Sequence, residues 1–360
     1  MQLKTIFDAV EEDMVKVEDH LDSFTKSSEA EHLSNLLSHV FDSKGKRARP
    51  VLTLLSGGFS HTNRENVIRM ASAVEMLHIA TLVHDDTVDE AKTRRGRVTV
   101  SSNWGQHTAV LLGDYIFAAS ATYVCDTKNV RVIRRFSETI MELSRGELLE
   151  MSGAFQANFD LGKYLERIYL KTGSLFSTAG ESGAVLSEID ETQVSALKTF
   201  SYKLGMAFQV MDDILDFEGD EKTLGKPVGS DLLNGIITLP AIYASENTKL
   251  KGLIDSFFLD RSKIEIHSEI TELIKQSCSI EKCYTYARNL IAEAKEQLSL
   301  LPPQTPQSST SASPLQSPAQ SILSLLPPHT PQSSTAASPL QSPAQSILSL
   351  LPPQTPQSST

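Results

Sequence analysis

The sequence predicts an all-α fold, and three observations support this prediction. Apolar residues recur at helical spacing, for example at Met70, Val74 and Leu77. Alternating strand patterns are nearly absent, and residues 97–101 are the best short candidate. Turn signals such as Gly57-Gly58 separate the apolar stretches. Together these features predict a large single-domain helical bundle with connections of a few residues.

The expected helices are marked by their own local signals. Pro50 and Pro240 indicate helix starts, because proline fits the first helical turn. One apolar face runs from Val67 toward an aspartate-rich segment near residue 85. A second face has apolar residues at steps of three and four, at Leu204, Phe208, Met211 and Leu215. The sequence Gly225-Lys226-Pro227 predicts a turn after that helix.

Charge and proline content divide the chain into two regions. All 33 basic and 44 acidic residues precede residue 297, whereas most of the 16 prolines follow residue 301. The second region repeats every 25 residues, since Leu300-Leu301-Pro302-Pro303 recurs from Leu325 and from Leu350. Dense proline and sparse apolar residues favour a disordered chain with polyproline II character. We therefore expect a folded body over residues 1–297 and a low-complexity, disordered tail over residues 298–360.

Composition excludes several classes of protein. No run of 18 apolar residues appears, so we expect no transmembrane segment, and the acidic N-terminus lacks a signal-peptide pattern. The 3 cysteines have no metal-ligand spacing and are typical of a reducing compartment, which predicts a cytoplasmic protein. The net charge of -11 argues against a nucleic-acid partner.

Two segments of the form Asp-Asp-x-x-Asp each end an apolar helical stretch. One contains Asp85, Asp86 and Asp89, and the other contains Asp212, Asp213 and Asp216. On a helix the first and third carboxylates share a face, and the second lies about 100° away. Three clustered carboxylates repel one another unless a cation binds them. Oxygen ligands of this kind suit Mg²⁺, which is typically shared between carboxylates and substrate phosphates.

Two basic segments accompany the acidic ones. Lys46, Arg47 and Arg49 precede a helix, and Arg94-Arg95 follow the first aspartate cluster by five residues. Guanidinium groups match phosphate oxygens, and lysine acts as a point charge. Because the body is acidic overall, these cations predict a local diphosphate pocket.

These segments resemble the trans-prenyl diphosphate synthase (polyprenyl synthetase) family, of long-chain type. Six segments match in family order over roughly residues 30 to 242. They are Gly45 to Pro50, His78 to Gly96, Gly146-Glu147-Leu148, Lys171-Thr172 with Leu175-Phe176, Phe208 to Asp213, and Gly225 to Leu232. The resemblance implies that residues 1–297 are a catalytic domain of the isoprenoid synthase type. It also implies an enzyme that acts as a homodimer, although a heteromer is possible.

The resemblance implies a prenyl transfer reaction in which isopentenyl diphosphate condenses with an allylic diphosphate. Two to three Mg²⁺ ions would be held by Asp85, Asp89 and Asp212, with Asp86, Asp213 and Asp216 in support, and Asp85, Asp89, Asp212 and Lys171 would be catalytic. Isopentenyl diphosphate would bind Lys46, Arg49, His78 and Arg95. The allylic diphosphate would bind Arg94, Lys171, Thr172, Gln209 and Lys226.

Product length is predicted from the residues upstream of the first cluster. Short-chain members of the family place aromatic side chains at the fourth or fifth position before the first aspartate. Here those positions are Thr81 and Ala80, which are small, and Leu77 lies deeper by the helical rise. We therefore expect a long all-trans product of the C30 to C50 class.

Four alternatives stay open at this point. A terpene cyclase would pair one Asp-rich motif with a different second metal motif, whereas this chain has the same motif twice. A short-chain synthase (C15 to C20) would need another helix to close the cavity. A non-catalytic partner subunit of a heteromeric synthase would usually have degraded aspartate motifs, and both motifs are intact here. An interaction protein would use the proline-rich tail. The repeat also begins where a terminal helix is expected, so we expect that helix to be missing.

Overall fold

The computed structural model describes residues 9–26, 30–43, 45–59, 63–219, 227–262 and 264–301. Within these ranges the secondary structure is helical apart from one short hairpin, which confirms the all-α prediction. The tail from residue 302 and the segment 220–226, which includes Lys226, lie outside the described residues.

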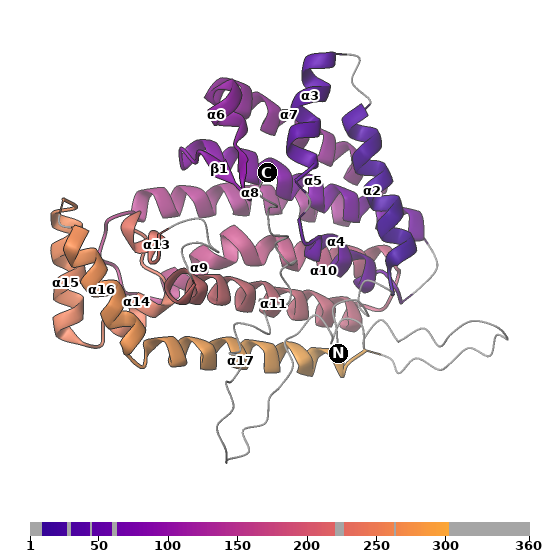
Figure 1. Ribbon diagram of the computed structural model, residues 1–360. Coiled ribbons are helices and arrows are strands. Elements are labelled where there is room, and N and C mark those ends of the chain that lie inside the picture. The colour runs from indigo at the N-terminus through magenta and orange to yellow at the C-terminus, as the bar shows by residue number, and fades with distance from the viewer. Residues whose placement is uncertain are drawn as a thin grey trace, which may run out of the picture.

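The described helices form one bundle (Figure 1). In the first half they are α2 (Glu11–Lys26), α3 (Glu31–Phe41), α4 (Ala48–Ser56), α5 (Arg64–Val88), α6 (Val100–Trp104), α7 (Gln106–Cys125) and α8 (Val130–Gly153). In the second half they are α9 (Leu161–Ile168), the π-helix η1 (Tyr169–Gly173), α10 (Ser174–Leu186), α11 (Glu191–Glu218), α13 (Ser230–Leu233), α14 (Leu239–Ala244), α15 (Thr248–Leu259), α16 (Ile264–Gln276) and α17 (Ser279–Leu298).

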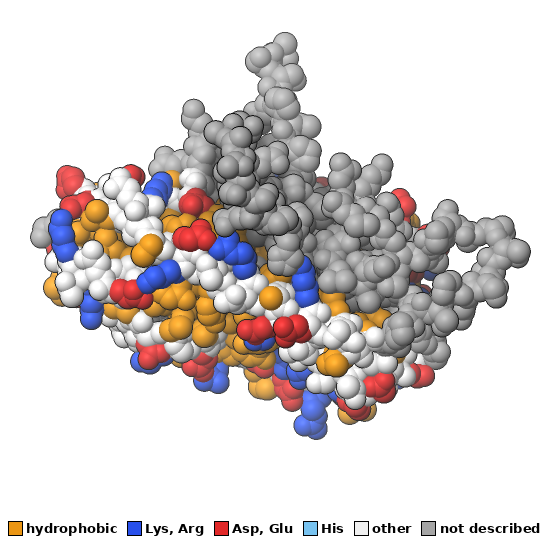
Figure 2. Space-filling model, turned by 90° about the horizontal axis from the view of Figure 1, so that it is seen from below, with side chains coloured by type: hydrophobic (Ala, Val, Ile, Leu, Met, Phe, Trp, Pro, Cys, Tyr) orange, Lys and Arg blue, Asp and Glu red, His pale blue; other side chains and the backbone are white. Residues whose placement is uncertain are grey.

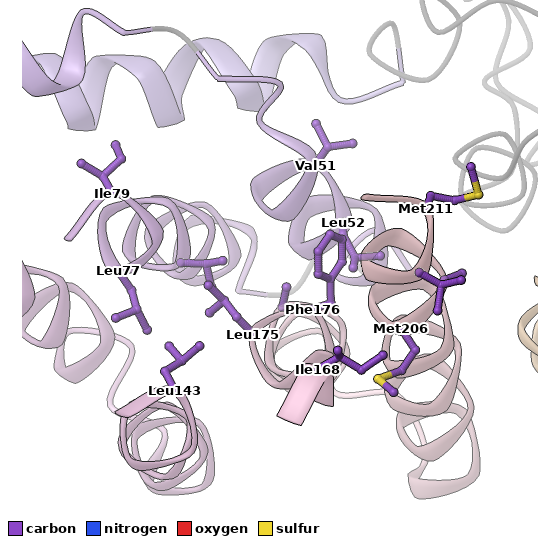
Figure 3. Close-up of a cluster of buried hydrophobic side chains, with 14 of the residues drawn as sticks. Val51, Leu52, Leu77, Ile79, Leu143, Ile168, Leu175, Phe176, Met206 and Met211 are labelled. Atoms are coloured by element: carbon purple, nitrogen blue, oxygen red, sulfur yellow. The ribbon is translucent and has the colours of Figure 1, made fainter. Parts of the chain in front are cut away.

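Helix α5 lies at the centre of the bundle and packs against α2, α4, α7 and α10. Helix α11 lies between α10 and α17, and these three run side by side in Figure 1. The apolar face predicted for α5 is in the core, where Met70, Val74 and Leu77 are fully buried. Of the face predicted for α11, Met211 is buried and the other three residues are half-buried and packed against the core. Below the candidate site, apolar side chains from several helices lie close together, including Leu77 of α5 opposite Leu143 of α8 (Figure 3). This packing fixes the ends of α5 and α11 relative to each other.

Capping side chains explain where several helices begin. The side chains of Asn129, Asp160 and Asp190 accept hydrogen bonds from backbone N–H groups of the first turns of α8, α9 and α11. Each bond satisfies a donor that the helix itself leaves without a partner. The predicted start at Pro240 is also confirmed, because this proline lies in the first turn of α14.

The strand candidate at residues 97–101 is only partly correct. Strand β2 (Arg97–Val98) pairs antiparallel with β1 (Thr93–Arg94), but α6 begins at Val100. The Thr99 side chain accepts a hydrogen bond from the Ser102 backbone and thereby starts that helix. The resulting hairpin carries Arg94 and Arg95 back over the end of α5.

The expectation of a missing terminal helix falls on the repeat, which from residue 302 lies outside the described residues. The last helix of the described chain is α17. Helix α17 lies along α11, and its apolar face, including Ile280, Leu290 and Ala294, is buried. Its sequence is charged on the other side, as the alternation of Arg288, Glu293 and Lys295 shows. The face of the molecule on this side has acidic and basic side chains interspersed around apolar ones (Figure 2).

Two described helices, α5 and α7, are long and apolar enough to cross a membrane by length and composition alone. For α5 the apolar character belongs to the core, because 72% of its apolar window is buried. For α7 only 33% of that window is buried, and Val110, Leu111 and Tyr115 are exposed. The exposed face of α7 therefore needs a separate explanation.

Candidate active site

The first aspartate cluster lies on the last turn of α5, where the side chains differ in their surroundings. Asp86 is buried, and its Oδ1 accepts a hydrogen bond of 2.6 Å from Arg94 Nε. Asp85 is half-buried and Asp89 is exposed. As the predicted spacing requires, the Asp89 N–H donates to the Asp85 carbonyl one turn earlier. Asp85 and Asp89 thus lie one turn apart on the same face of α5.

Lys171 faces these carboxylates from the π-helix η1. Its Nζ atom lies 2.8 Å from Glu147 Oε1 and 2.5 Å from Glu150 Oε1, both on α8. The close approach of α8 to η1 depends on Gly146, because a Cβ atom there would lie 2.9 Å from Lys171 Cγ. A single π-turn inside a helix is frequent at functional sites, and this one sets the direction of Lys171 and Thr172.

The carboxylates around the first cluster outnumber the cations that compensate them. Burial and then the charge of Glu147 raise the pKa of Asp85 to about 7, against the opposing effect of Lys171 and Arg94. Burial and Glu150 also raise the pKa of Asp89. A group of oxygen ligands with raised pKa values has chemistry that suits a hard divalent cation.

The second aspartate cluster lies near the end of α11, and its three carboxylates point to different partners. Asp212 is exposed, and its charge acts on Lys46 and Arg49. Asp213 is buried, and it accepts hydrogen bonds from Tyr164 Oη at 2.6 Å and Gln209 Nε2 at 3.0 Å. Asp216 is also buried and accepts hydrogen bonds from α13.

Four cationic or neutral side chains predicted for isopentenyl diphosphate come together between α4, α5 and the hairpin. Burial lowers the pKa of His78 well below its usual value, and the charges of Arg49 and Arg95 lower it further. His78 is therefore a neutral imidazole near pH 7. Burial likewise lowers the pKa of Lys46, which interacts with Asp212 and Arg95. Lys46 and Arg49 thus lie within reach of the charge of Arg95, and Arg49 and Arg95 within reach of His78.

Arg49 has a buried hydrogen-bond donor that an anion could accept from. Its guanidinium lies 4.5 Å from the Phe176 ring centroid, and its buried Nε atom has no hydrogen-bond partner among the described residues. Burial lowers its pKa to about 10. An orphaned, buried guanidinium N–H is costly unless a ligand accepts from it, and a diphosphate oxygen fits that need.

Arg47 has a structural role although it lies between two predicted ligands. Its guanidinium donates to Glu75 Oε1 at 2.7 Å and to Glu18 Oε1 at 2.7 Å, and its backbone is left-handed with φ 52°. These two ion pairs connect the start of α4 to α5 and α2. Lys46 and Arg49, on either side of Arg47, are thereby held near His78 of α5.

The residues predicted for the allylic diphosphate are partly brought together. Arg94 and Lys171 both act on Asp85. Thr172 donates a hydrogen bond of 2.7 Å to Gln209 Oε1, which connects η1 with α11. A cavity of about 60 Å³ beside the hairpin is lined by His78, Asp86, Arg94 and Arg95, among others. Lys226 lies outside the described residues.

The residues predicted to set product length lie on α5 below the first cluster. Ala80 and Leu77 are fully buried, while Thr81 is half-buried and donates a hydrogen bond to the His78 carbonyl. Leu77 points toward Leu143 of α8 (Figure 3). The direction of growth toward these residues stays a prediction.

Some contacts of the site had no sequence signal. Tyr164, the π-helix and the pairing of Glu75 with Arg47 were not anticipated, because each depends on contacts between distant segments. Glu147 and Glu150 were recognisable as polar helix residues, but only the approach of η1 shows that they bind Lys171.

Comparisons with known proteins agree with this geometry. The polyprenyl synthetase family model matches residues 30–274. "Heptaprenyl diphosphate synthase component 2" of Geobacillus stearothermophilus is 36% identical over 302 residues, covering 84% of this chain and 94% of the relative.

Solved structures give the same result. The heptaprenyl diphosphate synthase of Staphylococcus aureus matches with a TM-score of 0.81 and 35% identity, covering 88% of this chain and 96% of that one. A polyprenyl synthase of Caulobacter crescentus CB15, in complex with calcium and isoprenyl diphosphate, matches with a TM-score of 0.80 and 28% identity, covering 89% and 95%. Family model, sequence relatives and fold agree, and the chain belongs to the polyprenyl synthetase family of trans-prenyl diphosphate synthases, and within it to the long-chain type.

Proposed function

We propose that this protein condenses isopentenyl diphosphate with an allylic diphosphate and repeats the step to give an all-trans polyprenyl diphosphate of about C30 to C50. The observation that carries the proposal is the convergence of both aspartate clusters with Lys46, Arg49, Arg95 and Lys171. Anionic and cationic groups in one space suit a substrate with a diphosphate and its metal ions.

The donor set supports a magnesium site on Asp85, Asp89 and Asp212. Burial and other nearby carboxylates raise the pKa values of Asp85 and Asp89, and Asp212 is exposed within reach of Lys46 and Arg49. Asp86, Asp213 and Asp216 would support them, and two to three ions are expected. When bound there, magnesium supplies Lewis-acid stabilisation of the departing diphosphate.

The side chains of the chain itself would perform four tasks. Arg94, Lys171 and Thr172, with Gln209 and Lys226, would hold the allylic diphosphate and stabilise its negative charge as the carbon–oxygen bond breaks. Lys46, Arg49 and Arg95 would hold isopentenyl diphosphate, and neutral His78 would donate a hydrogen bond to it. The double bond of isopentenyl diphosphate would then attack the allylic carbon, and a proton would leave the new chain. The buried apolar residues below α5 would exclude water from the cation.

A direct assay tests the proposal. The protein is incubated with Mg²⁺, radiolabelled isopentenyl diphosphate and farnesyl or geranylgeranyl diphosphate, and the products are sized. We expect incorporation and products longer than C25. Products that stop at C15 to C20 would support the short-chain alternative. No incorporation with any primer would contradict catalysis by the chain alone.

We further propose a cytoplasmic homodimer that uses the exposed apolar side chains of α7 and α8. They are Val110, Leu111, Tyr115, Met141, Leu148, Leu149 and Met151. Apolar patches of this kind mark protein interfaces. Sedimentation of the wild type and of a Leu111→Glu, Leu148→Glu double variant tests this, since a dimer is expected only for the wild type.

A heteromer is the second candidate, and the relative named as a component favours it. In that case this chain would carry the intact aspartate clusters, and the other subunit would complete the enzyme. Incorporation by the purified chain alone would exclude that requirement.

A further inference from the structure

Asp216, the third acid of the second cluster, is fully engaged by α13. Its Oδ1 accepts a hydrogen bond from the Ser230 hydroxyl at 2.7 Å, and its Oδ2 accepts one from the Asp231 N–H at 3.1 Å. Its own carbonyl accepts a third bond from the Gly229 N–H at 2.8 Å. The side chain is 2% exposed. Both carboxylate oxygens are therefore turned to the start of α13.

The same backbone segment is held from the other side by α16. His267 Nε2 donates to the Gly229 carbonyl at 2.9 Å, and His267 is buried beside the Phe257 ring at 5.5 Å. The Nε2 tautomer follows from the acceptor, since a carbonyl oxygen requires a donor. Gly229 is thus bound through its N–H to α11 and through its C=O to α16.

Gly229 can be replaced by no larger residue in this position. Its φ of 71° is left-handed, and a Cβ atom would lie 2.8 Å from Thr271 Oγ1 and 3.3 Å from His267 Nε2. A side chain at position 229 would therefore disturb the packing of this residue between α11 and α16.

The position of α13 matters for the site because it brings a fourth carboxylate to the second cluster. Burial, and then the charge of Asp231 on α13, raise the pKa of Asp213 to about 7. Asp231 therefore lies close to Asp213. Helix α13 begins at Ser230, four residues after the predicted ligand Lys226 in the sequence.

We propose that Asp216 is a positioning residue that fixes the start of α13 against α11, with Ser230 and His267 as its partners, and that it is not a magnesium ligand. Only the expected kinetic effect of this inference rests on the proposed function. Asp212 differs from Asp216 because it is exposed and faces Lys46 and Arg49. The two acids, one turn apart, would have different tasks.

The test compares Asp216→Asn and Ser230→Ala with Asp212→Asn. Asparagine retains one acceptor of Asp216, and alanine removes only the hydroxyl that donates to it. We expect Asp216→Asn to raise the KM for the allylic diphosphate about tenfold, the loss of one charge-assisted hydrogen bond, and Ser230→Ala to act in the same direction. The Mg²⁺ concentration for half-maximal rate should stay unchanged in both and rise only in Asp212→Asn.

A second measurement needs no catalysis. Amide hydrogen exchange of residues 229–233 in the metal-free protein should become faster in Asp216→Asn, Ser230→Ala and His267→Phe, and remain unchanged in Asp212→Asn. A raised Mg²⁺ requirement in Asp216→Asn together with unchanged exchange would overturn the proposal. If the wild type incorporates no isopentenyl diphosphate, the proposed function fails, while the exchange result still decides the role of Asp216.

Discussion

The two aspartate clusters have the same sequence form but different surroundings. At the end of α5, Asp85 and Asp89 interact with Lys171, and only Asp86 is committed to an ion pair. On α11, Asp213 is bonded to Tyr164 and Gln209, and Asp212 alone of its cluster is exposed. The difference follows from the neighbouring elements, because both helices end at their clusters. Helices α9 and α13 bind the buried acids of the second cluster, whereas the hairpin binds Asp86 of the first. A repeated motif thus specifies the residue type, and the neighbouring helices specify its task.

The largest expected difference is in catalysis. Asp85→Asn should reduce kcat/KM at saturating Mg²⁺ by roughly a thousandfold, because it removes a charge aimed at the diphosphate site. Asp213→Asn should cost less, since its partners Tyr164 and Gln209 are neutral. Steady-state rates with farnesyl diphosphate measure both. Circular dichroism of the two variants controls for folding, and equal losses in well-folded variants would remove the distinction between the clusters.

The next effect concerns product length. Ala80 lies five residues before Asp85, and Ala207 lies five residues before Asp212. If the chain grows only below the first cluster, Ala80→Phe should shorten the product by several isoprene units. Ala207→Phe also overfills a buried position and is the matched control, with an expected loss of stability and no shorter product. Thin-layer sizing of the products decides, and an unchanged length in Ala80→Phe would contradict the predicted cavity.

A smaller effect is expected from the carboxylates that hold Lys171. Glu150 lies 2.5 Å from Lys171 Nζ and 3.6 Å from Arg167 Nε. Because Glu150 competes with the diphosphate for Lys171, Glu150→Gln should lower the KM for the allylic substrate a few-fold. The exposed pair of Arg145 with Glu166 provides the control, since Glu166→Gln should change neither constant. A raised KM in Glu150→Gln would mean that the pair orients Lys171.

Sequence reasoning reached the fold and the composition of the site but not the tasks of its members. Helical spacing predicts the buried faces of α5 and α11 because burial follows periodicity. The cations at Lys46, Arg49 and Arg95 were recognised because diphosphate chemistry needs them. The hydrogen bonds of Asp213 and Asp216 were not predicted, since Tyr164 and Ser230 are distant in sequence and ordinary in type. The expected loss of a terminal helix falls on the repeat from residue 302, outside the described residues, and stays a prediction.

The smallest effect is the contribution of Asp213, in the second cluster, to the pH dependence of stability in the metal-free protein. Asp213 has a pKa of about 7 in the folded state, raised first by burial and then by Asp231, against 3.8 as its ordinary value. A carboxyl group whose pKa is raised in the folded state contributes its full stabilisation at pH values below its ordinary pKa. This stabilisation is lost as the pH rises through about 7. The free energy of unfolding should therefore fall between about pH 4 and 7 by a few kcal/mol through this group.

Urea unfolding in EDTA at several pH values measures this loss. In Asp213→Asn the curve of unfolding free energy against pH should be flatter by that amount, because asparagine does not ionise. The exposed Asp19 on α2 supplies the control, and Asp19→Asn should keep the wild-type slope. Added Mg²⁺ should stabilise the wild type and Asp213→Asn by similar amounts if Asp213 supports the site without binding the ion. An equal slope in wild type and Asp213→Asn would show that the Tyr164 and Gln209 hydrogen bonds compensate the burial of this carboxylate completely.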